Sequence, residues 1–286
     1  MQQIKISRPM HYPDVVINTD SDKIIEQISM LHSGFISYLD AETFLAKRQT
    51  NSNKHTDNHL EVTVEQIDND QFNVQYNNLI FQTDNPLQKI DEILFKNINI
   101  LNGTFAMHAA AVEYKGKAYA LAAVTTTGKT TLTTYLIHNG FNYITDDCVL
   151  INQTDFSVYP YCKSLHLREG GIEVLKNHSI LPREMYHLKD KTIQRYIFTP
   201  DNCISKPIPL GGILFIKRSE VENSVSGIST AECINTLMRS PITYYKITSN
   251  YIRFVSQLSK INCKKVVYKD MEFVAEYIKS EVFDNG

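Results

Sequence analysis

The residues best suited to chemistry lie in one short stretch, the run AVTTTGKTT at positions 123–131. It is close to the phosphate-binding pattern G-x-x-x-x-G-K-[ST], in which backbone N–H groups and a helix N-terminus hold phosphate oxygens. In that pattern the lysine reaches the β- and γ-phosphates, and the following hydroxyl binds magnesium. The stretch therefore predicts a nucleotide site, with Lys129 at the phosphates and Thr130 at Mg²⁺.

The remainder of this loop is expected to surround the phosphates. The nucleotide-binding residues predicted are Thr125, Thr126, Thr127, Gly128, Lys129, Thr130 and Thr131. Ala123 stands where the pattern has glycine, and a Cβ there narrows the approach to the phosphates. Two interpretations stay open: a phosphate-binding loop, or a Gly-Lys-Thr-Thr run that is only a helix start after a strand.

A second chemical signal is the acidic pair Asp146 and Asp147, directly after the apolar run 141–144. One carboxylate can hold magnesium, and the other can accept a proton from an attacking hydroxyl. Adjacent carboxylates also push one pKa upward, which favours a base. The alternative is an ordinary turn or helix cap after a strand.

Local patterns predict the elements that position these residues. A strand over 107–114, a turn and a strand over 118–124 lead into the loop, and a helix over 129–139 ends at Gly140. The strand 141–144 then leads to the acidic pair. In a parallel sheet the carboxyl ends of the strands meet at one ligand crevice, so we expect the loop and the pair to converge.

The rest of the chain suggests a division into residues 1–95 and 96–286. The first part predicts a helix over 24–31, an exposed polar connection over 46–59, and a hairpin that docks an acceptor or only caps a sheet edge. The hairpin strands are 60–67 and 71–81, around a turn at 68–70. Further elements are expected as helices over 86–98, 230–238, 252–258 and 271–281 and a buried strand over 209–216.

Composition narrows the class of protein. The 286 residues are 43% hydrophobic and 21% charged with a net charge of -2, which gives no general attraction for nucleic acid or anionic lipid. No signal peptide or apolar run long enough for a membrane span is evident, so we expect a cytoplasmic protein. The five cysteines are widely spaced, which predicts reduced thiols and no zinc site.

Taken together, these segments resemble the catalytic domain of HPr kinase/phosphorylase. The resemblance covers roughly residues 95 to 260 and is greatest to stand-alone HPr-kinase-like proteins found with ribosomally made peptides, including lasso-peptide precursor kinases. The matching runs are MHAAAV at 107–112, KGK at 115–117, GKTT at 128–131, GF at 140–141, ITDDCVL at 144–150, YPY at 159–161, LHLR at 165–168 and PLGGILF at 209–215. The implied fold class is α/β: a P-loop HPr-kinase/PEP-carboxykinase-like catalytic domain, preceded by a small α+β N-terminal domain.

The resemblance also implies roles for single residues. It makes Asp146 the base, Asp147 its neighbour near the metal, and His108 a side chain beside the pair. It makes Arg168 a candidate for neutralising the transferred phosphoryl group, although a surface salt bridge explains an arginine equally well. The expected catalytic residues are Asp146, Asp147, His108, Lys129 and Arg168, and the expected metal-binding residues are Thr130 and Asp147.

One departure bears on the substrate. Bifunctional HPr enzymes have a glutamate two positions before this arginine, where this chain has His166, with Glu169 just after Arg168. The departure weakens the expectation of phosphorylase activity and of HPr as substrate.

The function expected is a kinase that uses ATP, or GTP, and Mg²⁺. It would transfer the γ-phosphoryl group to a hydroxyl, such as a serine of a peptide or protein, with a ribosomally made precursor peptide as one acceptor. Two alternatives stay open: a small-molecule kinase, and a degenerate P-loop protein that binds a nucleotide or a peptide without catalysis. The hexamers of HPr kinases make a homo-oligomer one expected assembly.

Overall fold

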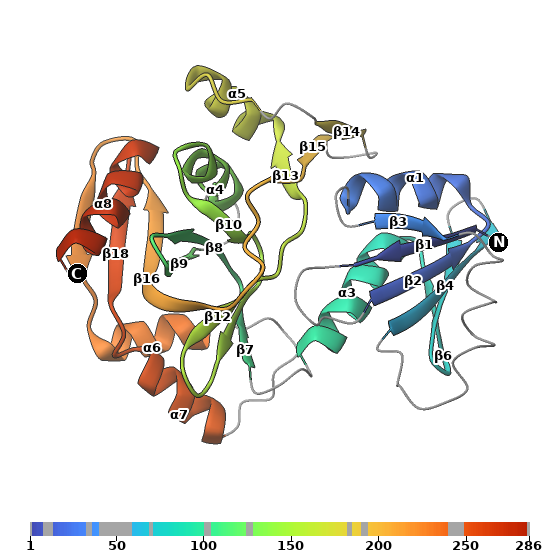
Figure 1. Ribbon diagram of the computed structural model, residues 1–286, viewed down its shortest axis with the longest axis horizontal. Helices are drawn as coiled ribbons and strands as arrows, with labels where there is room; N and C mark the ends of the chain where they lie inside the picture. Colours follow the sequence, from blue (N-terminus) through green and yellow to red (C-terminus); the bar gives the residue numbers. More distant parts are fainter. Residues whose placement is uncertain are drawn as a thin grey trace. The chain divides into compact units, whose positions relative to one another are not determined.

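The chain forms two compact units, Met1–Leu101 and Asn102–Gly286. The computed structural model describes residues 2–7, 14–32, 36–39, 59–68, 71–99, 104–123, 128–181, 185–189, 194–239 and 249–284. These described residues have a mixed α/β architecture with seven helices (Figure 1). The division expected at 95/96 falls inside the last helix of the first unit.

The first unit is a six-stranded sheet in the order β3-β1-β2-β4-β5-β6, with helices α1 and α3. Alternating side chains such as Val62 and Val64 are buried and join Ile28 and Leu94 of the two helices in one apolar core. The bounds are β1 (Gln2–Ile6), β2 (Asp14–Thr19), α1 (Asp22–Leu31), β3 (Ile36–Leu39), β4 (His59–Asp68), β5 (Gln71–Tyr76), β6 (Leu79–Thr83) and α3 (Pro86–Asn99).

Most of the elements predicted in this unit are confirmed. The helices expected over 24–31 and 86–98 are α1 and α3, and the first hairpin strand is β4. The single strand expected over 71–81 is wrong, because a turn divides it into β5 and β6. Asn77 has a φ of 53° in this turn, a left-handed conformation that asparagine tolerates. Residues 46–58 of the expected polar connection and turn residues 69–70 lie outside the described residues.

The second unit is built on a nine-stranded sheet. Seven strands follow the order β10-β8-β9-β16-β12-β11-β7, and β18 pairs with both β16 and β17. A separate sheet has the order β13-β15-β14. The strands are β7 (Thr104–Met107), β8 (Ala109–Tyr114), β9 (Lys117–Ala122), β10 (Asn142–Thr145), β11 (Val149–Asn152), β12 (Ser157–Tyr159), β13 (Leu165–Arg168), β14 (Tyr186–Lys189), β15 (Gln194–Phe198), β16 (Ile208–Arg218), β17 (Ser224–Gly227) and β18 (Cys263–Tyr268). The helices are α4 (Lys129–His138), α5 (Glu169–Asn177), α6 (Thr230–Met238), α7 (Ser249–Leu258) and α8 (Met271–Asp284).

The sheet is mixed, so the expected parallel sheet is wrong, yet the expected convergence still occurs. Strand β8 runs antiparallel to both β9 and β10, so it begins at the edge where those two strands end. His108, Ala123 and Asp146 therefore come to the same edge. Strands β16 and β18 run parallel to β9, which brings their last residues, Arg218 and Tyr268, to this edge as well.

The predicted strand over 107–114 is broken at His108. Strand β7 pairs with β11, whereas β8 pairs with β9 and β10, so the chain changes partners at the histidine. The other elements predicted here are confirmed with small shifts of their ends, and they include α4, β10, β16, α6, α7 and α8.

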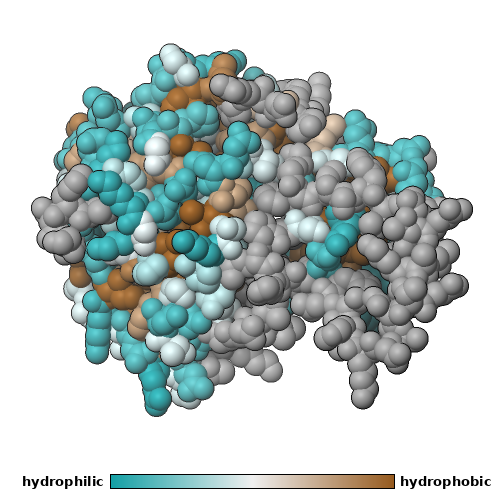
Figure 2. All heavy atoms as spheres, viewed as in Figure 1, coloured by the Kyte–Doolittle hydropathy of each residue, from teal (hydrophilic) through white to brown (hydrophobic). Residues whose placement is uncertain are grey.

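None of the helices in the described part of the chain has both the length and the apolar character needed to cross a bilayer. On the face drawn in Figure 2, hydrophilic residues cover most of the described surface, and apolar residues appear in smaller groups.

Candidate functional site

The start of helix α4 is shaped by Gly128. This residue is the N-cap, with a φ of 84° that favours glycine, and it has no side chain to cap the helix. Among the described residues the first N–H groups of α4 thus remain available to a ligand, and the helix dipole favours an anion there. The predicted loop residues Thr125, Thr126 and Thr127 lie outside the described residues.

Lys129 is folded back against the end of β9. Its side chain is buried, and its Nζ donates a hydrogen bond to the Ala123 carbonyl oxygen at 3.2 Å. Burial lowers the pKa of Lys129, while the charges of Asp146 and Asp147 act in the opposite direction. The ammonium retains further N–H groups, so it can bind an anion placed at the start of α4.

A hydrogen bond from Thr130 Oγ1 to Asp146 Oδ2, 2.8 Å long, joins the first turn of α4 to the end of β10. Asp146 is only 3% exposed, and its Oδ1 has no hydrogen-bond partner among the described residues. Burial, reinforced by the charge of Asp147, raises the pKa of Asp146 to about 7. A buried oxygen without a partner is costly, so this carboxylate is poised to accept a ligand.

Asp147 has a different environment from its neighbour. It forms an ion pair with Lys163, and the lysine charge holds the pKa of Asp147 well below its usual range. His108 Nδ1 lies 3.1 Å from the backbone oxygen of Asp147, so this ring nitrogen donates the hydrogen bond. Burial and the charge of Lys129 lower the pKa of His108, which favours a neutral ring that holds the Asp147 backbone in place.

A cavity of about 550 Å³ brings the predicted site together. Each predicted site residue that the structure describes lines it: His108, Gly128, Lys129, Thr130, Thr131, Asp146, Asp147 and Arg168. This shared location was expected from the sequence, whereas the individual roles stay predictions.

Sequence reasoning gave no site role to four polar residues of this region, although it noted His166 at the position of the family's glutamate. His166, Arg195 and Arg218 line the cavity, and Lys163 neutralises Asp147. Arg218 could have been found, because it follows the predicted strand 209–216 just as Asp146 follows 141–144. Arg195 gave no such signal, since it reaches the site only through pairing of β15 with β13.

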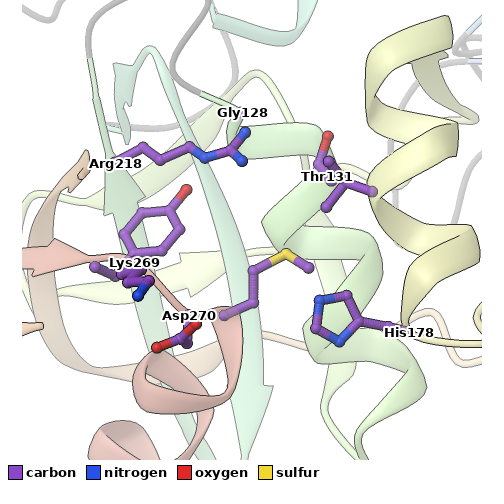
Figure 3. Close-up of a pocket in the computed structure, with 9 residues that line it drawn as sticks. Gly128, Thr131, His178, Arg218, Lys269 and Asp270 are labelled. Carbon is purple, nitrogen blue, oxygen red and sulfur yellow. The ribbon is translucent and has the colours of Figure 1, made fainter. Parts of the chain in front are cut away.

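A smaller cavity of about 100 Å³ adjoins the start of α4. It shares Gly128, Thr131 and Arg218 with the larger cavity and is also lined by His178 and Asp270. Figure 3 shows the Arg218 guanidinium reaching toward Gly128. The two cavities thus meet at the start of the helix.

Helix α5 packs closely beside this helix start. A Cβ added to Gly171 would lie 2.7 Å from Thr131 Oγ1, closer than real Cβ contacts come. The absence of a side chain at Gly171 therefore allows α5, and Arg168 at its start, to approach the phosphate-binding region.

The comparisons with known proteins find similar chains among solved structures. No family model matches the chain, and no curated protein matches it. Among solved structures, the HPr(Ser) kinase/phosphatase from Coxiella burnetii is similar at 11% identity with a TM-score of 0.30, over 63% of this chain and 95% of that one. At these values the similarity assigns no role to any residue, and the function proposed below follows from the site geometry.

Replacing Asp146 with asparagine should change how stability depends on pH when no metal is present. The folded-state pKa of Asp146 is about 7 against an ordinary value of 3.8, so between these values the folded protein keeps a proton that the unfolded chain releases. Asp146 therefore destabilises the fold increasingly as pH rises, by about 1.4 kcal/mol per pH unit at most. The free energy of unfolding of Asp146→Asn relative to wild type should rise from about pH 4 to about pH 7 and then level off. Denaturant unfolding with a chelator present measures it.

His166 makes the free energy of unfolding depend on pH in the opposite sense. Both proteins contain it, so its effect cancels when they are compared. Burial lowers its pKa to about 3, which makes stability rise with pH in both proteins. Parallel stability curves for wild type and Asp146→Asn would show that Asp146 is ionised throughout this range.

Proposed function

We propose that this chain is a magnesium-dependent kinase that transfers the γ-phosphoryl group of ATP or GTP to a hydroxyl. The Thr130–Asp146 hydrogen bond beside Lys129 carries the proposal. A P-loop phosphotransferase needs a lysine at the phosphates, a hydroxyl at the metal and a strand-end aspartate next to it. The fold brings these three groups to one cavity although the aspartate is distant from the loop in sequence.

The residues at the bottom of the cavity fit Mg²⁺. Asp146 Oδ1 is buried without a partner among the described residues, and Thr130 offers a hydroxyl beside it. The described residues contain no group of three His, Cys, Asp or Glu that could hold a metal. Mg²⁺ suits such a site, because it commonly takes one or two carboxylates together with substrate phosphates and waters. When bound, it would neutralise charge on the phosphate oxygens.

This proposal changes one sequence-based role. Asp147 was expected near the metal, but Lys163 already pairs with it, and Asp146 is the carboxylate that contacts Thr130. We therefore place Thr130 and Asp146 at the metal. The role of Asp146 as the base stays a prediction, and without a metal Asp147, whose pKa is depressed by Lys163, is the weaker proton acceptor of the two.

The remaining groups suit a nucleotide. The start of α4 and Lys129 would face the phosphates, and Arg218 lines both the larger and the smaller cavity. Phosphates at the helix start would leave the sugar and base toward the smaller cavity, next to Gly128. Nothing at these positions favours ATP over GTP, so both nucleotides belong in the assays.

We further propose a peptide or protein as the acceptor, which is what the sequence resemblance implies. In the first unit, Leu79 and Ile80 are 57% and 63% exposed on β6, the last strand in the sheet order. An end strand with exposed apolar side chains suits an extended peptide that adds as a further strand.

Lys129→Met should abolish magnesium-dependent turnover. The change removes the cation that faces the phosphates, so phosphoryl transfer and nucleotide hydrolysis should fall by about 100-fold or more. Phosphate release with ATP and with GTP measures it. Lys260→Met, an exposed position after α7 and outside both cavities, is the matched control and should keep full turnover.

Calorimetric titration with each nucleotide completes this experiment. Undiminished turnover in Lys129→Met would refute the residue assignment. Wild-type protein that binds a nucleotide without any transfer would instead support the non-catalytic alternative, which Ala123 in place of the usual glycine favours.

Thr130→Val should raise the magnesium requirement. Valine keeps the shape of threonine but lacks the hydroxyl that bonds Asp146, so half-maximal turnover should need about tenfold more Mg²⁺. Thr130→Ser keeps the hydroxyl and should stay near wild type. Magnesium titrations of turnover at fixed nucleotide test this, and equal requirements in the valine and serine variants would contradict the metal assignment.

A further inference from the structure

Two arginines that do not belong to the start of α4 also line the larger cavity. Arg168 of β13 and Arg195 of β15 are direct partners in an antiparallel ladder. Directly opposite residues project their side chains from the same face of a sheet. Both arginines line the cavity of about 550 Å³. The small sheet therefore presents two guanidinium groups side by side to the site.

These two charges have no counter-ion within the described residues. No ion pair there joins Arg168 or Arg195 to a carboxylate. Like charges directly opposite each other destabilise an antiparallel pair. Their neighbour His166 is kept neutral, because burial and the charges of Lys163 and Arg195 lower its pKa to about 3. A bound anion would relieve the repulsion between the arginines.

The backbone beside the arginines adds donors for such an anion. Helix α5 is nine residues long, Arg168 is its N-cap, and the Arg168 side chain makes no capping hydrogen bond. Gly170 and Gly171 of its first turn line the cavity, and apart from adjacent residues and the helix backbone, no described atom lies within 4 Å of where a Cβ on Gly170 would be. The free N–H groups at a helix start bind oxyanions. Glu169, in the same turn, is exposed and does not line the cavity.

We propose that Arg168, Arg195 and the start of α5 form a second oxyanion subsite, which binds a phosphate or carboxylate group of the phosphoryl acceptor. This inference rests on the proposed kinase function. The nucleotide phosphates already have Lys129, the start of α4 and Arg218. Two further guanidinium groups, from a different sheet, match a second anion. The peptide or protein acceptor then carries an oxyanion close to the reacting hydroxyl.

Inorganic phosphate is the probe for this subsite. Wild-type protein is first saturated with Mg²⁺ and the non-hydrolysable ATP analogue AMP-PNP, and phosphate is then titrated calorimetrically. Phosphate should bind to this loaded protein. Its affinity should fall by about tenfold or more in Arg168→Met and in Arg195→Met, and by less in Arg195→Lys. The affinity for AMP-PNP should stay within about twofold of wild type in Arg195→Met and Arg195→Lys, because Arg195 contributes to the second anion alone.

Arg253→Met is the matched control, since Arg253 is exposed on α7 and lines neither cavity. It should bind phosphate as wild type does. Competition by methyl phosphate or by acetate then identifies whether a phosphate ester or a carboxylate is the preferred group.

Two results would overturn the subsite: exclusion of phosphate by AMP-PNP, or a loss of AMP-PNP affinity in Arg195→Met without loss of phosphate affinity. Either one would assign the arginines to the nucleotide. If wild type bound no AMP-PNP, the proposed function would fail instead. Phosphate binding that required Arg168 and Arg195 but not Lys129 would then still establish the subsite.

Thermal unfolding shows whether a loss of phosphate binding in Arg195→Met comes from a folding defect. Phosphate should raise the Tm of the loaded wild type but not that of Arg195→Met. Without phosphate, the variant should be at least as stable as wild type, because it removes a like-charge contact. A strongly lowered Tm without phosphate would show that Arg195 supports the fold, and would also count against the subsite.

Discussion

Asp146 is a carboxylate with 3% exposure, and only one of its two oxygens has a hydrogen-bond partner among the described residues. Such burial destabilises a fold whenever the group is ionised. A stable structure alone would be better served by an asparagine or an apolar residue at this position. Protonation removes this cost below the raised pKa of about 7, and a cation at the free oxygen would remove it above that pH, in keeping with the metal role proposed for Asp146.

The mixed sheet satisfies this constraint by geometry. Strand β8 lies between β9 and β10 and is antiparallel to both, so β9 and β10 run in the same direction. Because the strand breaks at His108, β8 begins at the edge of the sheet where β9 and β10 end. His108, directly before β8, can thus contact the backbone of the acidic pair. The loop follows the end of β9, and the acidic pair follows the end of β10. A parallel sheet would give the same convergence of strand ends, but it would not place a strand entry between them.

Strong local signals made the centre of the site predictable. Each signal depends only on residues that are neighbours in sequence, and the structure has the predicted elements. The signals are an apolar strand, the run Gly-Lys-Thr-Thr, a helix that ends at Gly140 and a strand before Asp146. The turn at Asn77 was also local, but its asparagine pair was read as part of one long strand. Lys163 and Arg195 could not be predicted, because their partners come from other parts of the chain through loops and cross-strand pairing. The central loop residues 124–127 lie outside the described residues, so their predicted contacts stay predictions.

Charge is distributed unevenly around the cavity, and this distribution separates the two acidic neighbours. Lys163 compensates Asp147, while Asp146 has a hydroxyl and a free oxygen facing the start of α4. On the other side, the arginines of β13 and β15 have no carboxylate partner among the described residues. A single triphosphate with magnesium would account for the side with Lys129 and Asp146. Among the described residues no carboxylate pairs with these arginines, and an anion on the second reactant would offset their charge, as the proposed acceptor subsite requires.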